Sequence, residues 1–172
     1  DWRKDGRARL NVIAKKGDLP GEVDDPRKGR EVEVTVREAQ SGDRLRPGLA
    51  LIARGDHHLL VHRVGSVYVA ELDSGPLVSR HRPSVDVLFG SVARVAGAEA
   101  VGVILSGMGA DGAEGMLSLR RAGAATIAQD QQSSVVFGMP REAIERGAVQ
   151  SIVPIDRIAA TILERVGSGD RT

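Results

Sequence analysis

Alternation of apolar and polar residues marks the first elements that this sequence predicts. Between residues 32 and 37, valine alternates with charged or polar residues, which is typical of a half-buried strand. A short apolar run at residues 49–53 follows an Arg-Pro-Gly turn and predicts a second strand. Apolar residues at 59–61 and 67–72 flank the sequence Arg-Val-Gly-Ser, so these two segments predict a β-hairpin.

Helical spacing first occurs after residue 83. Apolar residues in the segment 85–96 recur at intervals of three and four, which predicts a helix with one buried face. Ser84 has the side chain of an N-cap, and Asp86 falls in the first turn. Gly97 suits the position just after the helix, where the backbone often becomes left-handed. The segment therefore predicts one capped helix.

Strands and helices then alternate three times. Such alternation predicts a parallel sheet with helices on both of its faces. We therefore expect an α/β fold with a doubly wound, mostly parallel sheet and a small β-hairpin region. The predicted strands are residues 100–105, 124–128 and 148–153, and the predicted helices are residues 114–122, residues 141–146 and a last helix from residue 156.

The first 33 residues differ in composition from the rest of the chain. They contain 9 basic and 8 acidic side chains, so more than half of the segment is charged. High charge with few apolar residues favours a weakly attached arm or linker, with a partner-binding tail as the alternative. We therefore expect an arm at residues 1–33, an α/β domain at 34–166 and a tail at 167–172.

Composition also narrows the class of function. The net charge is +1 and the chain has one Trp, one Tyr and two Phe, which argues against nucleic-acid binding. The absence of cysteine fits a reducing compartment. No apolar run approaches the roughly 18 residues of a membrane-spanning helix, and the charged start is unlike a signal peptide. These features predict a cytoplasmic protein without membrane insertion.

The strongest candidate site is the glycine-rich segment 105–112, which follows a predicted buried strand. Loops at the carboxyl ends of parallel strands commonly carry functional residues. Gly107 and Gly109 permit a tight turn and a close approach of a ligand to the backbone. Asp111 is the candidate reactive group, beside the free N–H groups of the next predicted helix.

The same segment allows a second interpretation. Residues 107–112 match the dinucleotide pattern G-x-G-x-x-G between a strand and a helix, and Asp130 follows 18 residues after Gly112. However, Asp111 would place negative charge beside a pyrophosphate. Charge therefore argues against a nucleotide site, although the spacing allows one.

The histidines provide weaker candidates. His58 and His62 lie four residues apart in a predicted strand without a convincing acidic third ligand, so no metal site is predicted. His81 and Arg82 belong to a basic turn before the helix that starts after Ser84. They either order this loop or face a substrate.

Three segments together resemble one family. They are residues 80–89 (Arg-His-Arg-Pro-Ser-Val-Asp-Val-Leu-Phe), 102–112 (Gly-Val-Ile-Leu-Ser-Gly-Met-Gly-Ala-Asp-Gly) and 135–143 (Val-Val-Phe-Gly-Met-Pro-Arg-Glu-Ala). In this order they resemble the catalytic domain of the chemotaxis protein-glutamate methylesterase, the CheB type. Residues 38–43 and 47–48 resemble the strand and turn that precede these motifs. The resemblance extends from about residue 34 to residue 166.

This resemblance implies a doubly wound α/β domain with a Ser–His–Asp triad and no cofactor or metal. It implies hydrolysis of methyl esters on receptor glutamates and deamidation of certain receptor glutamines. Asp111 matches the family's triad acid, and Met108 matches a residue that lines the site or serves the oxyanion through its N–H. The implied partners are a methylated chemoreceptor and, in full-length relatives, a receiver domain regulated by phosphorylation.

One departure from the family pattern concerns the other two triad members. The family's serine lies in a Gly-Ala-Ser-Thr-Gly-Gly turn and its histidine in a Gln-His-Met segment, both before the part matched by residues 34–43. Residues 1–33 contain neither serine nor histidine, so the first strand–helix units are missing or replaced. Two alternatives to an esterase follow: a non-catalytic remnant that acts as a binding module, and a dinucleotide-binding half-domain that uses residues 107–112.

Overall fold

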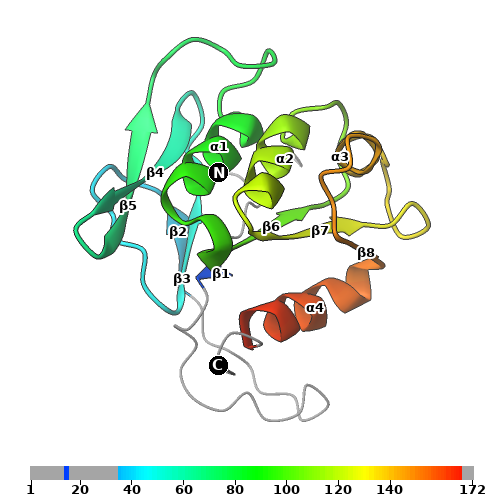
Figure 1. Ribbon diagram of the computed structural model, residues 1–172. Helices are drawn as coiled ribbons and strands as arrows, with labels where there is room; N and C mark the ends of the chain where they lie inside the picture. Colours follow the sequence, from blue (N-terminus) through cyan, green and yellow to red (C-terminus); the bar gives the residue numbers. More distant parts are fainter. Residues whose placement is uncertain (1–13, 16–34, 168–172) are drawn as a thin grey trace.

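The computed structural model describes residues 14–15 and 35–167, which form an α/β fold around a mainly parallel sheet (Figure 1). The strand order is β1-β6-β7-β8. Strands β6, β7 and β8 are parallel, and β1 is antiparallel to β6. The predicted fold class is thereby confirmed. The strands are β1 (Ala14–Lys15), β6 (Ala100–Ile104), β7 (Ala125–Gln129) and β8 (Ser151–Val153).

Helices cover both faces of this sheet. Helices α1, α2 and α3 lie on one face and α4 lies on the other (Figure 1). The Ser84 side chain accepts a hydrogen bond from the N–H of Val87, so the predicted N-cap of α1 is confirmed. Gly97 has a φ of 50°, in the left-handed region predicted for the end of that helix. The helices are α1 (Val85–Val95), a 3₁₀ turn η2 (Gly97–Glu99), α2 (Ala113–Arg121), α3 (Met139–Glu145) and α4 (Ile155–Gly167).

Two small strand pairs lie beside the main sheet. Strands β4 and β5 form the predicted antiparallel hairpin, and β2 and β3 form a separate parallel pair. All four residues of β2 are exposed, so the prediction of a half-buried strand is wrong for residues 35–37. Strand β2 pairs only with β3 and is not covered by the helical layer of the main sheet. These strands are β2 (Thr35–Glu38), β3 (Leu49–Ile52), β4 (His58–Val64) and β5 (Val67–Asp73).

Strand β8 is shorter than the predicted segment 148–153. The N–H of Ala148 donates to the carbonyl of Ala143 at 2.9 Å, which closes the end of α3. The guanidinium of Arg120 donates to the carbonyls of Gly147 and Val149. The backbone at residues 147–149 therefore bonds to the helix layer, and contact with β7 begins with the N–H of Gln150, which donates to the carbonyl of Thr126 at 3.0 Å.

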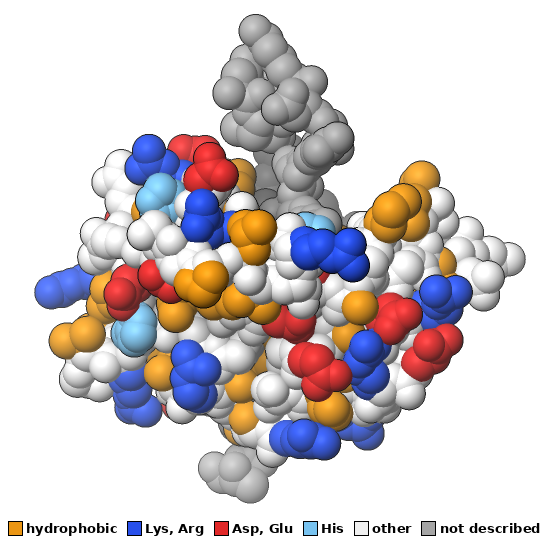
Figure 2. All heavy atoms as spheres, turned by 90° about the horizontal axis from the view of Figure 1, so that it is seen from above, with side chains coloured by type: hydrophobic (Ala, Val, Ile, Leu, Met, Phe, Trp, Pro, Cys, Tyr) orange, Lys and Arg blue, Asp and Glu red, His pale blue; other side chains and the backbone are white. Residues whose placement is uncertain are grey.

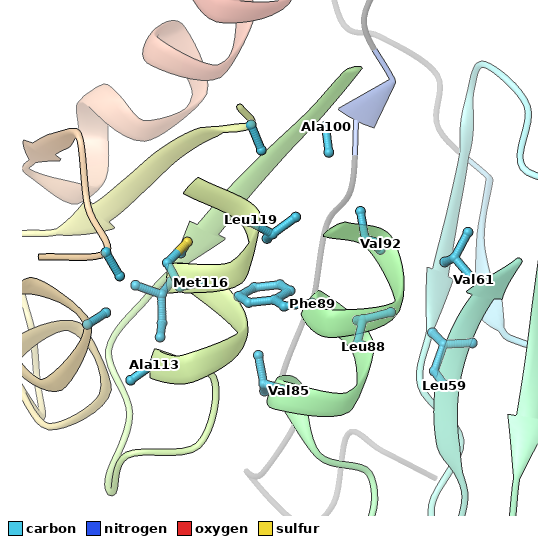
Figure 3. Close-up of a cluster of buried hydrophobic side chains, with 14 of the residues drawn as sticks. Leu59, Val61, Val85, Leu88, Phe89, Val92, Ala100, Ala113, Met116 and Leu119 are labelled. Carbon is cyan, nitrogen blue, oxygen red and sulfur yellow. The ribbon is translucent and has the colours of Figure 1, made fainter. Parts of the chain in front are cut away.

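The main core lies between α1, α2 and β4, where apolar side chains from the three elements interlock (Figure 3). A second, smaller cluster lies between the sheet and α4. The labelled core residues are Leu59 and Val61 of β4, Val85, Leu88, Phe89 and Val92 of α1, Ala100 of β6, and Ala113, Met116 and Leu119 of α2.

The predicted arm lies outside the described residues except for Ala14 and Lys15. Ala14 pairs with Val101 and Lys15 with Ala100, so β1 extends the main sheet beyond β6. The predicted tail is described only at Gly167. Among the helices of residues 35–167, none combines the length and the apolar character needed to cross a membrane.

Candidate active site

The glycine-rich segment forms the loop between β6 and α2, as predicted. Gly109 and Gly112 have φ values of 94° and 98°, a conformation that other residues rarely adopt. A Cβ atom on Gly112 would lie 2.7 Å from Cγ1 of Val85. Glycine at position 112 therefore allows the loop to pack closely against the start of α1.

Asp111 is the central residue of this loop and is almost fully buried, with 1% of its surface exposed. Its Oδ1 accepts hydrogen bonds from the hydroxyl of Ser84 at 2.7 Å and from the N–H of Asp86 at 3.1 Å. Its Oδ2 accepts one from the N–H of Val85 at 2.9 Å. The amide groups at a helix N-terminus carry partial positive charge and stabilise a carboxylate. The first turn of α1 therefore holds the carboxylate of Asp111 in one orientation.

A second carboxylate makes the reverse contact, from α1 to the first turn of α2. Asp86, in the first turn of α1, accepts a hydrogen bond at 2.8 Å from the N–H of Gly115 in the first turn of α2. Burial raises the pKa of Asp86 above its ordinary value, the bond from Gly115 acts against this, and the nearby charge of Asp111 adds to it. The first turn of α1 thus binds Asp111 from the loop before α2, and the first turn of α2 binds Asp86 from α1.

His58 supports this network from β4. It is 2% exposed, and its Nδ1 accepts a hydrogen bond from the N–H of Ser84 at 3.2 Å. Its Nε2 lies 2.9 Å from the carbonyl oxygen of Pro76. Because Nδ1 accepts, the proton is on Nε2, which donates to Pro76. From the sequence, His58 was a candidate only as a metal ligand, and no local signal indicated its bond to Ser84.

A second loop, between β7 and α3, is hydrogen-bonded to the loop between β6 and α2. The N–H of Gly107 donates to the carbonyl of Val136 at 2.9 Å, and the carbonyl of Gly107 accepts from the N–H groups of Gly138 and Met139 at 3.1 and 2.8 Å. A Cβ atom on Gly107 would clash with Sδ of Met139, so a larger residue at position 107 would displace that side chain between the two loops.

Apolar side chains are exposed on these two loops. Met108 is 74% exposed and Val135 is 93% exposed, and Val136 is also exposed. On the face shown in Figure 2, apolar side chains lie on the surface among charged ones. The loop that holds Asp111 therefore has an apolar rim formed by Met108, Val135 and Val136.

His81 and Arg82 lie in the connection between β5 and α1. Nη1 of Arg82 donates to the carbonyls of Ser74 and Gly75 at 3.0 and 2.8 Å, which orders this connection. Nδ1 of His81 and Nε of Arg82 are buried without a hydrogen-bond partner among the described residues. The connection ends at Ser84, so it meets the Asp111 loop at the start of α1.

The structure gives less support to the remaining candidates. Oδ1 of Asp130 accepts from the N–H and the hydroxyl of Ser133 at 2.9 and 2.7 Å, so this carboxylate closes its own loop. His62 pairs with Glu71 at 2.6 Å on the exposed part of the hairpin. Within residues 35–167, no three His, Cys, Asp or Glu side chains gather as a metal site would require.

Sequence reasoning placed Asp111, Gly107, Met108 and Gly109 in one loop, and the structure does the same. It did not find that Ser84 binds the carboxylate of Asp111. Ser84 carried a local signal as an N-cap, but its bond to a residue 27 positions away depends on the packing of α1 against α2.

Comparisons with known proteins agree with this geometry. The model of the CheB methylesterase family matches residues 27–162. A protein-glutamate methylesterase/protein-glutamine glutaminase from Albidiferax ferrireducens is 57% identical over 134 residues, which are 78% of this chain and 39% of that protein. Another from Chromobacterium violaceum is 60% identical over 133 residues, 77% of this chain and 37% of that protein. This chain thus spans less than half the length of these relatives.

A solved structure is also similar. The crystal structure of the Thermotoga maritima CheB methylesterase catalytic domain matches with a TM-score of 0.74 and 34% sequence identity. The match covers 76% of this chain and 69% of that domain. The similarity therefore extends over most of the described fold.

Proposed function

This chain belongs to the CheB methylesterase family, and we propose that it contributes the acid of a Ser–His–Asp site that hydrolyses protein glutamate methyl esters and deamidates glutamines. The observation that carries the proposal is the state of Asp111. Its carboxylate is buried at the end of a parallel strand and is held by one hydroxyl and two helix-terminal amides. A buried carboxylate that is fixed in this way suits the orientation of a catalytic imidazole.

The chemistry follows the general course of acyl transfer. The serine oxygen attacks the side-chain carbonyl carbon, and the histidine takes the proton from the serine. Methanol leaves from an ester and ammonia from an amide, and water then releases the acyl group as glutamate. Asp111 holds the histidine in the required tautomer and stabilises its charged form. The matching serine and histidine are not in residues 1–33, so this chain contributes only the acid.

In this proposal, Met108 and its neighbours bind the substrate. The backbone N–H of Met108 is the candidate donor to the oxyanion that forms on the attacked carbonyl. Gly107 and Gly109 keep that backbone accessible, and His81 and Arg82 are substrate-loop residues. The exposed apolar rim supports a protein substrate, which we identify as the methylated cytoplasmic region of a chemoreceptor. In full-length relatives, the family resemblance implies a receiver domain that regulates this activity through phosphorylation.

The dinucleotide alternative has little support from the loop geometry. The N–H of Gly107 already donates to Val136, so it does not bind a phosphate. The carboxylate of Asp130 accepts from Ser133 within its own loop, whereas a nucleotide site needs it on a ribose. We expect no saturable binding of NAD or ADP to this chain, which a calorimetric titration would measure.

The proposal is tested by restoring the complete site. The upstream segment of the Chromobacterium violaceum relative, which is 60% identical to this chain, is joined before residue 34. We expect this protein to release methanol from a methylated receptor and Asp111→Asn to lower its turnover by about 10⁴-fold. The exposed Asp56→Asn is the control and should have no effect. The proposal is wrong if the joined protein is inactive or if Asp111→Asn behaves like the control.

The 172-residue chain alone is measured in the same assay. Without the matching serine and histidine we expect no methanol release above the control without protein. Release by this chain would mean that another pair of residues does the chemistry. If the joined protein is inactive yet still binds the receptor, a non-catalytic binding module is the correct interpretation.

A further inference from the structure

A chain of hydrogen bonds leads from the connection after β5, through His58 of β4, to the carboxylate of Asp111. It starts at the carbonyl of Pro76, passes through the imidazole of His58 and the amide of Ser84, and ends with the Ser84 hydroxyl on Oδ1 of Asp111. We infer that Ser84 is a positioning residue of the esterase and that His58 holds Ser84 in place. This inference rests on the proposed function, because it concerns how the proposed acid is oriented.

The Ser84 hydroxyl differs from the other donors to Asp111. The donors from Val85 and Asp86 are backbone amides, which any sequence at those positions would provide. The hydroxyl comes from a side chain and makes the shortest of the three bonds, 2.7 Å against 2.9 and 3.1 Å. It holds Oδ1 while Val85 holds Oδ2, so the carboxylate cannot rotate without breaking one of these bonds.

Ser84 is itself held from two sides. Its N–H donates to Nδ1 of His58, and its hydroxyl oxygen lies 3.5 Å from the N–H of Val87, as an N-cap does. Ser84 and His58 are both 2% exposed, so water does not readily replace these bonds. The position of the hydroxyl is thus set by β4 as well as by α1.

Orientation matters for an acid that acts through a histidine. A misplacement of about 1 Å in a catalytic group can lower the rate about 10²-fold. Ser84→Ala leaves Oδ1 with the longer bond from the amide of Asp86, at 3.1 Å, so the carboxylate is held less firmly in its orientation. Such a change should slow the chemical step and leave substrate binding unaffected, because Ser84 is buried behind Asp111.

The test uses the joined protein described above, and the control is a second buried serine of the same helix. Ser91 is 0% exposed; its hydroxyl donates to the carbonyl of Leu88 at 2.7 Å and accepts from the N–H of Val61 at 2.9 Å. Ser91→Ala therefore removes comparable hydrogen bonds without touching Asp111. We expect Ser84→Ala to lower kcat by about 10- to 10²-fold with KM unchanged, and Ser91→Ala to leave both constants unchanged.

Conservative variants give a second, independent outcome. Ser84→Thr keeps the hydroxyl and should restore kcat to within about threefold of the original value. If Ser84→Thr does not fold, variants of His58 decide. His58→Asn keeps an acceptor toward the N–H of Ser84, whereas His58→Leu has no acceptor. A higher kcat in His58→Asn than in His58→Leu supports the inference, and an equal or lower one overturns it.

The outcomes also separate this inference from the proposed function. If Asp111→Asn abolishes turnover and Ser84→Ala has no more effect than Ser91→Ala, Ser84 is structural only and the inference is overturned. If the joined protein is inactive, or if Asp111→Asn has no effect, the proposed function itself is wrong and the inference falls with it.

Discussion

Helix α2 contacts two other helices, and carboxylates take part in both contacts in different ways. Toward α1, the buried carboxylate of Asp111 and the half-buried carboxylate of Asp86 accept hydrogen bonds from backbone amides across the contact. Toward α3, Arg146 bridges Glu114 at 2.9 Å and Glu142 at 2.5 Å on the surface. The side chain of Glu114 is 68% exposed, whereas Asp111 is 1% exposed.

This difference indicates which contact fixes the site. A buried donor that loses its acceptor costs about 1–3 kcal/mol, whereas an exposed ion pair contributes about 0–1 kcal/mol. The α1–α2 contact also uses Gly115, whose backbone lies directly against α1. The contact that holds Asp111 should therefore be sensitive to single substitutions, and the α2–α3 contact should tolerate them.

The largest effect is expected at Asp111. Asp111→Ala leaves the hydroxyl of Ser84 and the amides of Val85 and Asp86 without this acceptor, so the free energy of unfolding should fall by about 2–4 kcal/mol. Glu114→Ala, three residues away on the surface, should change it by about 0.5 kcal/mol or less. Urea unfolding of the two variants measures the difference. Equal effects would mean that the two contacts of α2 do not differ as the comparison requires.

Two glycine-to-alanine changes should have opposite signs. A Cβ atom on Gly115 would lie 2.6 Å from Cβ of Phe89, so Gly115→Ala forces α1 and α2 apart and should cost about 1–3 kcal/mol. In α1, a Cβ on Gly90 would meet only Nη1 of Arg94, at 3.8 Å. Gly90→Ala should therefore stabilise the protein by about 0.5–1 kcal/mol. Thermal unfolding of both variants measures the signs; a Gly115→Ala variant as stable as Gly90→Ala would contradict the close packing.

The sequence predicted the α1–α2 region well at the level of elements. The strand before Asp111, its loop and the following helix were all expected, because apolar period, glycines and caps are local signals. The structure differs by only one residue at the end of β6 and at each end of α2. Asp111 was a candidate for the same reason, since it lies in the glycine-rich loop.

The partners of these residues could not be predicted in the same way. Ser84 and Asp86 were expected to serve their own helix, but they bind Asp111 and Gly115 across the contact. Which carboxylate faces which amide depends on how closely the two helices pack, and that depends on Gly115 in the first turn of α2. Strand β2 shows the same limit. The alternation of valine with polar residues correctly predicted a strand, but whether a strand is buried depends on which other elements pack against it.

Asp86 should make the free energy of unfolding depend on pH. Burial raises its folded-state pKa above the ordinary 3.8, so the folded chain holds this proton more tightly than the unfolded chain. Its contribution to the free energy of unfolding therefore falls as pH rises from about 3.8 through the raised pKa. Asp86→Asn should remove this loss, so the variant should gain stability relative to the original chain over that range.

A second, partly buried aspartate, Asp43, provides a control in which the dependence on pH has the opposite sign. The hydrogen bonds from the Arg37 guanidinium, at 2.6 and 2.7 Å, lower the pKa of Asp43. Its contribution is present above the ordinary pKa and is lost as pH falls through the lowered one. Denaturant unfolding of Asp86→Asn and Asp43→Asn across acidic pH should give differences of opposite slope. Parallel slopes would contradict the assigned burial of Asp86.

The smallest effect is expected at the α2–α3 contact. Arg146→Met keeps the aliphatic part of the side chain and removes its charge, so a double-mutant cycle with Glu114→Ala isolates the ion pair. The coupling should be about 0.2–1 kcal/mol at low salt and should vanish near 1 M salt, where the Debye length is about 3 Å. The hydrogen bonds to Asp111 are buried, so the cost of Asp111→Ala should be the same at both salt concentrations. A coupling that survived 1 M salt would mean that α3 is held to α2 as firmly as α1 is. The position of the loop between β7 and α3 would then depend on Arg146 as well.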